Sequence, residues 1–490
     1  MVKSVIGDEN QLKLAEHRLT RSSIPSQIGL VIGKLNSKLD RGFVYDLVPT
    51  PPNDAGEQPC LVIDGAADFS KTKKKTSSKP KSQSDSSALF IDQDWVFEHA
   101  RQVSRMLLGG MKVVGVYVWV SESLFKNSTI TLCQTVIGVA QAASTMMDDL
   151  NERLLLHISY SPLRWTCRNC SLAANITSSS LWPCDFKTGK ILGSLQTFRC
   201  MYNFDVRLPI PHGDGLDSKR FSDVIRNEIM VHAKELKGVK ALIDGKLVVG
   251  DDLSVSDDFH EVEFLLPFMQ DKYLEACSQK EVLGVLLLRG SVCSLAYLNS
   301  KEPVSQALVD IKEDIIRSLQ SRLAIICDEA ERDIESMTGG DQGTNSHISS
   351  EEPVTNFDLQ AQRKQCNLSF PRRVLVPWLE GTYICDYIQS TETLEVLKEH
   401  CVELMSVEFP TDTSEILEPE SEAPTVIASS TAKTFWSAAT DHSSAAKPDS
   451  SVSKVRKTGK GRPATSADYV LMLTIFVLII AIVVFYFMGV

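Results

Sequence analysis

The order of hydrophobic and polar positions along the chain predicts strands that alternate with helices. Short apolar runs that are rich in β-branched residues and bounded by glycine, proline or polar residues are typical of buried strands. The strands predicted in this way cover 28–33, 43–48, 112–120, 154–160, 191–208, 262–266, 281–288, 291–298, 373–378 and 383–387.

Apolar residues three and four positions apart predict helices between these strands. One such stripe comprises Trp95, His99, Val103 and Met106, and the pair Gly109-Gly110 follows it as a helix-ending signal. The predicted helices cover 92–107, 128–150, 221–236, 304–334 and 393–405. Strands and helices in this order predict a three-layer α/β (α+β) fold.

Shifts in composition divide the chain into predicted domains. Proline and glycine in 206–217 indicate a boundary. The stretches 64–88 and 336–352 contain too few apolar groups to offset the entropy of ordering, so we expect a disordered insert and a loop there. The predicted organisation is a first domain over 1–205, a second α/β domain over 206–408 and a flexible tether over 409–468.

The last predicted helix is the most hydrophobic segment of the chain. Residues 470–488 carry no charge and, at about 1.5 Å per residue, are long enough to cross a ~30 Å hydrocarbon core. Lysines and arginines in 454–462 precede the run, and such a positive flank stays on the cytosolic side. We therefore predict a transmembrane helix over 469–488 that anchors a cytosolic chain to a lipid bilayer. The anchor residues include Val470, Leu471, Phe476, Ile480, Phe485 and Met488.

The net charge and the cysteine content restrict the classes of function that the chain can have. A net charge of −11 argues against a general nucleic-acid binder, because neutralising phosphates requires clustered basic residues. The lysines of the insert at 64–88 are compatible with contact to anionic lipid or with nuclear import, but a solvated insert is the interpretation we prefer. The twelve cysteines of a cytosol-facing chain are expected to be reduced thiols.

Cys167-Arg-Asn-Cys170 is the most suggestive chemical motif. A structural zinc site requires four ligands, and no second CxxC pair follows. A redox pair belongs at the start of a helix, whereas the surrounding sequence is typical of a strand. We therefore interpret both residues as ordinary thiols and predict no cofactor.

Three segments together resemble a known family. The first is Asp94–Gly110 (DWVFEHARQVSRMLLGG), which continues into a Val-Val-Gly-Val strand, the second is 373–387, and the third is the anchor. Over nearly its whole length the chain resembles the odorant-response-abnormal protein four family. The motif residues are Trp95, His99, Gln102, Arg105, Gly109, Gly110 and Gly115.

The resemblance implies a protein of the endoplasmic-reticulum membrane. Members of this family assist the folding, exit or localisation of multi-pass membrane proteins such as G-protein-coupled receptors. They also pair with the protease of the ubiquitin-fold modifier and hold it at that membrane. The implied partners are therefore multi-pass receptors and the modifier protease, in addition to lipid.

The resemblance also implies an MPN-like N-terminal domain. Active members of that fold hold a metal ion with an HxH pair and with a glutamate on an early strand. The two histidine positions fall on Val118 and Val120, and 21–33 contains no glutamate. Because valine neither ligates zinc nor lowers the pKa of zinc-bound water, we expect a catalytically inactive domain.

We therefore expect a tail-anchored adaptor rather than an enzyme. The alternative is a membrane-tethered hydrolase with a cysteine such as Cys167 as its nucleophile. A vesicle-fusion protein would require heptads next to the anchor, and 410–466 contains none.

Overall fold

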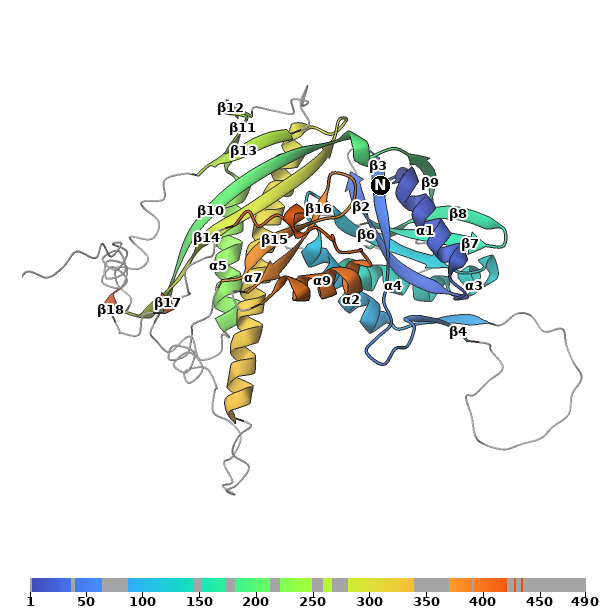
Figure 1. The fold of residues 1–490 in the computed structure, drawn as a ribbon, viewed down its shortest axis with the longest axis horizontal. Helices are drawn as coiled ribbons and strands as arrows, with labels where there is room; N and C mark the ends of the chain where they lie inside the picture. Colours follow the sequence, from blue (N-terminus) through green and yellow to red (C-terminus); the bar gives the residue numbers. More distant parts are fainter. Residues whose placement is uncertain are drawn as a thin grey trace, which may run out of the picture. The chain divides into compact units, whose positions relative to one another are not determined.

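The computed structural model of the protein describes most of the chain up to Glu420. The described residues are 2–36, 40–63, 87–144, 152–172, 181–211, 221–248, 259–266, 281–338, 370–389, 392–420, 427–428 and 433–434. All of them belong to one compact unit, Met1–Ala439. Their elements form a mixed α/β fold, which agrees with the predicted fold class at this level (Figure 1).

Seven strands close into a barrel in the order β1-β3-β2-β6-β7-β8-β9. Their bounds are β1 (Ser4–Asp8), β2 (Gln27–Asn36), β3 (Arg41–Pro49), β6 (Lys112–Trp119), β7 (Glu152–Tyr160), β8 (Leu163–Ser171) and β9 (Leu181–Gly189). β1 is parallel to both β3 and β9, and β6 is parallel to β7, whereas the other neighbours are antiparallel. A separate two-stranded ribbon consists of β4 (Cys60–Ile63) and β5 (Ala88–Ile91).

Helices pack against two different hydrophobic cores of the barrel. α1 (Glu9–Arg21) begins at Asp8, whose carboxylate accepts from two backbone N–H groups of the first turn, and it buries Leu12, Ala15 and Leu19. α2 (Gln93–Met106), α3 (Glu122–Asn127) and α4 (Thr129–Ala142) contribute to the other core. The predictions for α2 and α4 locate real helices, although 145–150 of the second lies outside the described residues. No predicted helix corresponds to α1.

The second sheet has the order β12-β11-β13-β10-β14-β17, with β18 also pairing with β14. Its strands are β10 (Leu195–Pro211), β11 (Lys240–Ile243), β12 (Lys246–Leu247), β13 (Phe259–Leu265), β14 (Glu281–Asn299), β17 (Ile427–Ala428) and β18 (Lys433–Thr434). α5 (Phe221–Lys237) and α7 (Val304–Thr338) share a hydrophobic core with this sheet.

Two sequence-based boundaries differ from this sheet. The predicted strands 281–288 and 291–298 form one strand, because β14 pairs with β10 in continuous register past Gly290, which lies opposite Phe204. β10 also continues through 205 and 206, where the sequence places a domain boundary. The proline and glycine signal at 206–217 thus coincides with the end of a strand and the connection to α5.

A hairpin and a helix complete the described unit. β15 (Arg372–Pro377) and β16 (Tyr383–Ile388) pair as predicted, and α9 (Leu394–Met405) follows them. Beyond α9, the stretch up to Glu420 was expected to be flexible tether. Instead Leu417 pairs with Leu375 of β15, and Ile416 and Glu420 are buried. We call residues 410–420 the strap.

Several predicted segments lie outside the described residues. They are the insert up to residue 86, the loop from residue 339, the tether at 421–426, 429–432 and beyond residue 434, and the anchor over 469–488. Within the ranges that the structure describes, no helix is long and apolar enough to cross a membrane.

Candidate functional site

The Gly109-Gly110 turn joins the motif helix α2 to the second sheet. Both residues have left-handed backbone conformations, with φ of 71° and 80°. The Gly109 carbonyl accepts a 2.9 Å hydrogen bond from the Tyr297 N–H group of β14. A Cβ at Gly109 would lie 1.9 Å from the Tyr297 ring, and one at Gly110 would lie 2.3 Å from the Asp310 carboxylate. Only glycine fits this contact.

Two further motif residues, in the first two turns of α2, attach this helix to neighbouring elements. Trp95 Nε1 donates to the Pro51 carbonyl at 2.9 Å. His99 is buried, and its Nε2 lies 2.8 Å from the Leu404 carbonyl in α9. Because a carbonyl can only accept, Nε2 carries the proton, and Nδ1 accepts from the Thr50 hydroxyl at 3.2 Å. His99 is therefore an interfacial core residue, as its position in the helical stripe suggests.

The other three motif positions also have structural contacts. Gln102 donates to the Glu98 side chain one turn earlier, and the Arg105 carbonyl accepts from the Cys385 thiol of β16 at 3.5 Å. A Cβ at Gly115 would lie 2.0 Å from the Leu154 carbonyl of the neighbouring strand β7. The motif residues thus lie where α2 packs against the barrel, α9 and the hairpin of β15 and β16.

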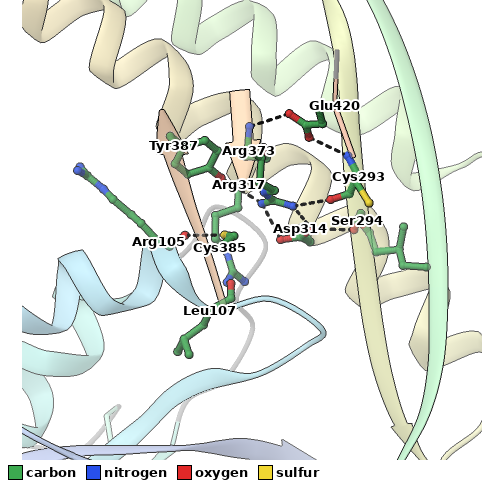
Figure 2. Close-up of polar contacts among 12 residues, drawn as sticks. Arg105, Leu107, Cys293, Ser294, Asp314, Arg317, Arg373, Cys385, Tyr387 and Glu420 are labelled. Atoms are coloured by element: carbon green, nitrogen blue, oxygen red, sulfur yellow. Dashed lines mark hydrogen bonds and ion pairs between the residues drawn. The ribbon is translucent and has the colours of Figure 1, made fainter. Parts of the chain in front are cut away.

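A buried arginine network lies at this junction (Figure 2). Arg373 of β15 donates to both oxygens of Asp314 of α7, at 2.7 and 3.0 Å, and to the Tyr387 hydroxyl at 3.0 Å. Ser294 donates to the same carboxylate at 2.7 Å. Burial by itself would lower the pKa of Arg373, but Asp314 raises it well above its ordinary value, so the guanidinium stays charged.

Glu420 of the strap forms the second half of the network. Arg322 Nη2 donates to both of its carboxylate oxygens at 2.7 Å, and both side chains are at most 2% exposed. The backbone N–H groups of Cys293 and Arg373 each donate to the same carboxylate at 2.8 Å. One carboxylate thus links the strap, α7, β14 and β15. We call Arg373, Asp314, Arg322 and Glu420 the arginine network.

Further charged contacts attach α7 to the barrel side. Arg317 donates to the Leu107 carbonyl at 3.1 Å, which satisfies an acceptor at the end of α2. Lys34 of β2 lies 2.6 Å from the Asp310 carboxylate and 3.4 Å from the Glu302 carboxylate. Lys34 thus meets two carboxylates inside the protein, and these contacts hold β2, α7 and the end of α2 together.

The cysteine of the alternative, hydrolytic interpretation is buried. Cys167 of β8 is 4% exposed and faces Cys184 in the β8–β9 register. A hydrogen bond with Cys184 and burial raise the pKa of Cys167 well above its ordinary value, which disfavours the thiolate that a nucleophile requires. The nearby Cys170 is buried as well, and all nine described cysteines are free thiols.

The two positions that correspond to metal-ligating histidines are occupied by buried valines. Val118 and Val120 are completely buried in the core that the barrel shares with α2 and α4. Among the described residues, no group of three or more histidine, cysteine, aspartate or glutamate side chains is placed to hold a metal ion.

The charged side chains that join α7 to its neighbours were not predicted from the sequence. Asp314 of the arginine network lies between Asp310 and Arg317 at steps of four and three along α7, which is the spacing of a single helix face. This spacing was the available signal, but charged residues beside an apolar stripe are usually solvated. Glu420 carries no comparable signal, because it lies in an acidic stretch with no periodicity.

Comparisons with known proteins identify relatives over most of the chain. The family model described as ODR4-like, odorant response abnormal 4-like, matches residues 29–416. A Protein odr-4 homolog of Xenopus tropicalis is 26% identical over 365 residues, covering 67% of this chain and 74% of the relative. The homolog of Mus musculus is 23% identical over 80% of this chain and 81% of its own, and that of Dictyostelium discoideum is 25% identical over 83% and 81%.

A solved structure is also similar, at a low level. It is the crystal structure of UfSP from C. elegans, with a TM-score of 0.36 and 9% identity over 83% of this chain and 57% of that one. At that score the likeness carries no argument about fold or activity.

Proposed function

Because this chain belongs to the odorant response abnormal 4-like family, we propose that it is a tail-anchored adaptor of the endoplasmic-reticulum membrane with its folded part in the cytosol. The match over residues 29–416 is the observation that carries the proposal. The adaptor assists the folding, trafficking or localisation of multi-pass membrane proteins such as G-protein-coupled receptors. It also holds the protease of the ubiquitin-fold modifier at that membrane.

The geometry supports an adaptor without chemistry of its own. The barrel is proposed to be a catalytically inactive MPN-like domain, because Val118 and Val120 stand where that fold carries metal-ligating histidines. The charges around α7 are used internally to join elements, and Cys167 is buried with a raised pKa. An anchored scaffold of this kind acts by raising the effective concentration of its partners at the membrane.

Proximity labelling from the membranes of cells that express the tagged full chain tests the proposal. We expect multi-pass membrane proteins and the modifier protease among the labelled proteins. The tagged Cys167→Ser variant should give the same labelled partners as the unchanged chain. The hydrolase alternative instead predicts that this variant loses the function of the chain. Recovery of neither partner class would remove the proposal.

A further inference from the structure

Cys167 and Cys170 of β8 point into different hydrophobic cores. Cys167 belongs to the core that α1 covers, whereas Cys170 belongs to the core on the side of α2 and α4 (Figure 1). Because they lie on opposite faces of one strand, the two cysteines of this motif cannot bond to each other. Each is hydrogen bonded to another cysteine instead, Cys167 to Cys184 of β9 and Cys170 to Cys133 of α4.

Cys167 and Cys184 lie directly opposite each other in neighbouring antiparallel strands. The Cα atoms of directly opposed residues are about 4.5–5.5 Å apart in such a pair, and a disulfide spans Cα separations of about 4.4–6.8 Å. Both side chains lie in the same core, and their thiols are hydrogen bonded. The backbone therefore already has the spacing that a bond between these two sulfur atoms requires.

This pair lies where the barrel closes. Cys184 is the last residue of β9 that pairs with β8, and Asp185 is the first that pairs with β1. The pairing between β8 and β9 is short, since it covers only Leu181–Cys184 of β9. A covalent bond at its end would hold β9 against β8 at the point where β9 turns to β1.

The two thiols differ in their readiness to react. The hydrogen bond between them lowers the pKa of Cys184 and raises that of Cys167, so the thiolate is favoured at Cys184. Cys184 is also the more exposed of the two, at 9% against 4%. Cys184 is therefore suited to attack an oxidant, and Cys167 is suited to resolve the product.

We propose that Cys167 and Cys184 form a reversible disulfide site, which locks β9 to β8 when the chain is exposed to hydrogen peroxide. Disulfides of cytosolic proteins are usually transient and sense redox conditions, and a reversible bond fits that role. The inference goes beyond the proposed adaptor function and does not depend on it.

The reaction proceeds in two steps. The Cys184 thiolate attacks one oxygen of hydrogen peroxide, the O–O bond breaks, and the departing hydroxide takes up a proton to become water. The Cys167 sulfur then displaces hydroxide from the Cys184 sulfenic acid, and the thiol proton of Cys167 leaves with it as a second water. The two thiols lose two electrons, which reduce the peroxide. A dithiol restores both thiols by exchange.

Peptide mapping of the full chain tests this site. The reduced chain in detergent micelles is treated with hydrogen peroxide, the remaining thiols are alkylated, and mass spectrometry identifies linked peptides before and after addition of dithiothreitol. We expect a link between Cys167 and Cys184 that dithiothreitol removes. The same link should be absent from the chain that is alkylated without peroxide.

Cys200 and Cys293 provide a matched control within the same chain. They are also buried and lie in the neighbouring antiparallel strands β10 and β14. They are one position out of register, however, because Cys200 lies opposite Ser294 and Cys293 lies opposite Met201. Their side chains consequently belong to different cores, and we expect no link between them.

Single substitutions separate the roles of the two thiols. Cys167→Ser keeps a hydroxyl that can donate a hydrogen bond but removes the resolving thiol. The sulfenic acid at Cys184, trapped with dimedone, should then increase at least about fivefold over the unchanged chain. Cys184→Ser should give neither a link nor an adduct at Cys167. Cys170→Ser, on the same strand, should leave the link unchanged, and circular dichroism verifies that each variant is folded.

Thermal unfolding measures whether the bond holds the barrel. Oxidation should raise the unfolding midpoint of the unchanged chain but not that of Cys184→Ser, because the bond restricts the unfolded chain. An unchanged or lower midpoint in the linked chain would overturn the proposed lock. Thiols of Cys167 and Cys184 that stay free under peroxide, or that link only in urea, would overturn the disulfide site. A link between Cys200 and Cys293 in equal yield would overturn it as well.

Discussion

At the scale of single residues, Glu420 is the charge by which the strap joins the arginine network. Glu420→Gln keeps the shape of the side chain but leaves Arg322 buried without a counter-charge, so we expect a loss of about 3–5 kcal/mol in the free energy of unfolding. Glu418→Gln removes a partner of Arg372 that is 38% exposed, and it should cost at most about 1 kcal/mol. Urea unfolding of both variants measures the difference, and equal losses would contradict the described role of Glu420.

Gly109 allows a similar comparison. Gly109→Ala places a methyl group against the Tyr297 ring in a left-handed conformation, and we expect it to destabilise the fold by more than about 3 kcal/mol. Gly381 has the same φ of 71° but no atom within 4 Å of the added Cβ, so Gly381→Ala should cost only the backbone strain, about 1 kcal/mol. Thermal unfolding distinguishes the two, and a tolerated Gly109→Ala would show that the turn is not a close contact.

His99 gives the fold a dependence on pH. Burial lowers the pKa of His99 to about 4, from an ordinary value of 6.5, although the Leu404 carbonyl partly opposes this shift. The unfolded chain therefore binds more protons below pH 6.5, and stability falls as the pH decreases toward 4. Between pH 7 and 5 this loss is about 2 kcal/mol, and His99→Gln should remove it.

His400 is the natural control for this measurement because its shift has the opposite sign. His400 Nδ1 donates a 2.8 Å hydrogen bond to the Asp386 carboxylate, which raises the pKa of His400, so its contribution is present at low pH and is lost as the pH rises through the folded-state pKa. His400→Gln should therefore make the loss on acidification steeper. Urea midpoints at pH 7 and 5 give both signs, and parallel behaviour of the two variants would contradict the assignment.

At the scale of elements, the strap changes where the tether begins. A chain that ends at residue 409 lacks both the Glu420 carboxylate and the pairing of Leu417 with Leu375. We expect it to lose at least as much stability as Glu420→Gln, whereas a chain that ends at residue 440 should unfold like the full chain. Thermal unfolding of the two truncations checks this, and an unaffected shorter chain would show that the strap contributes nothing.

The elements that the sequence predicts well are those with a strong periodic pattern. α2, β6 and α7 have long apolar stripes or runs, because each of them buries a whole face in a hydrophobic core. Their positions do not depend on a single contact with one residue far away in the sequence. α1 was missed because its buried residues, Leu12, Ala15 and Leu19, are few among polar ones. The strap was missed because its order depends on Arg322, which is 98 positions away in the sequence.

At the scale of the whole molecule, the family motif could be located from the sequence but its role could not. The helix stripe and the glycine pair predict where α2 ends. That Gly109 ends it against Tyr297, and that Arg317 meets its last carbonyls, depends on residues of β14 and α7 that carry no matching pattern. The sequence therefore identifies a family, and the structure identifies a junction held by buried charges.

We propose that the chain acts by placing partners at a membrane. The most direct test measures the share of the modifier protease that sediments with endoplasmic-reticulum membranes, in cells that lack the native chain and express a replacement. We expect that the full chain restores this share, that a chain without 469–488 does not, and that an unrelated tail anchor fused after residue 468 restores it again. Equal membrane association of the protease with and without the anchor would overturn the proposed adaptor role.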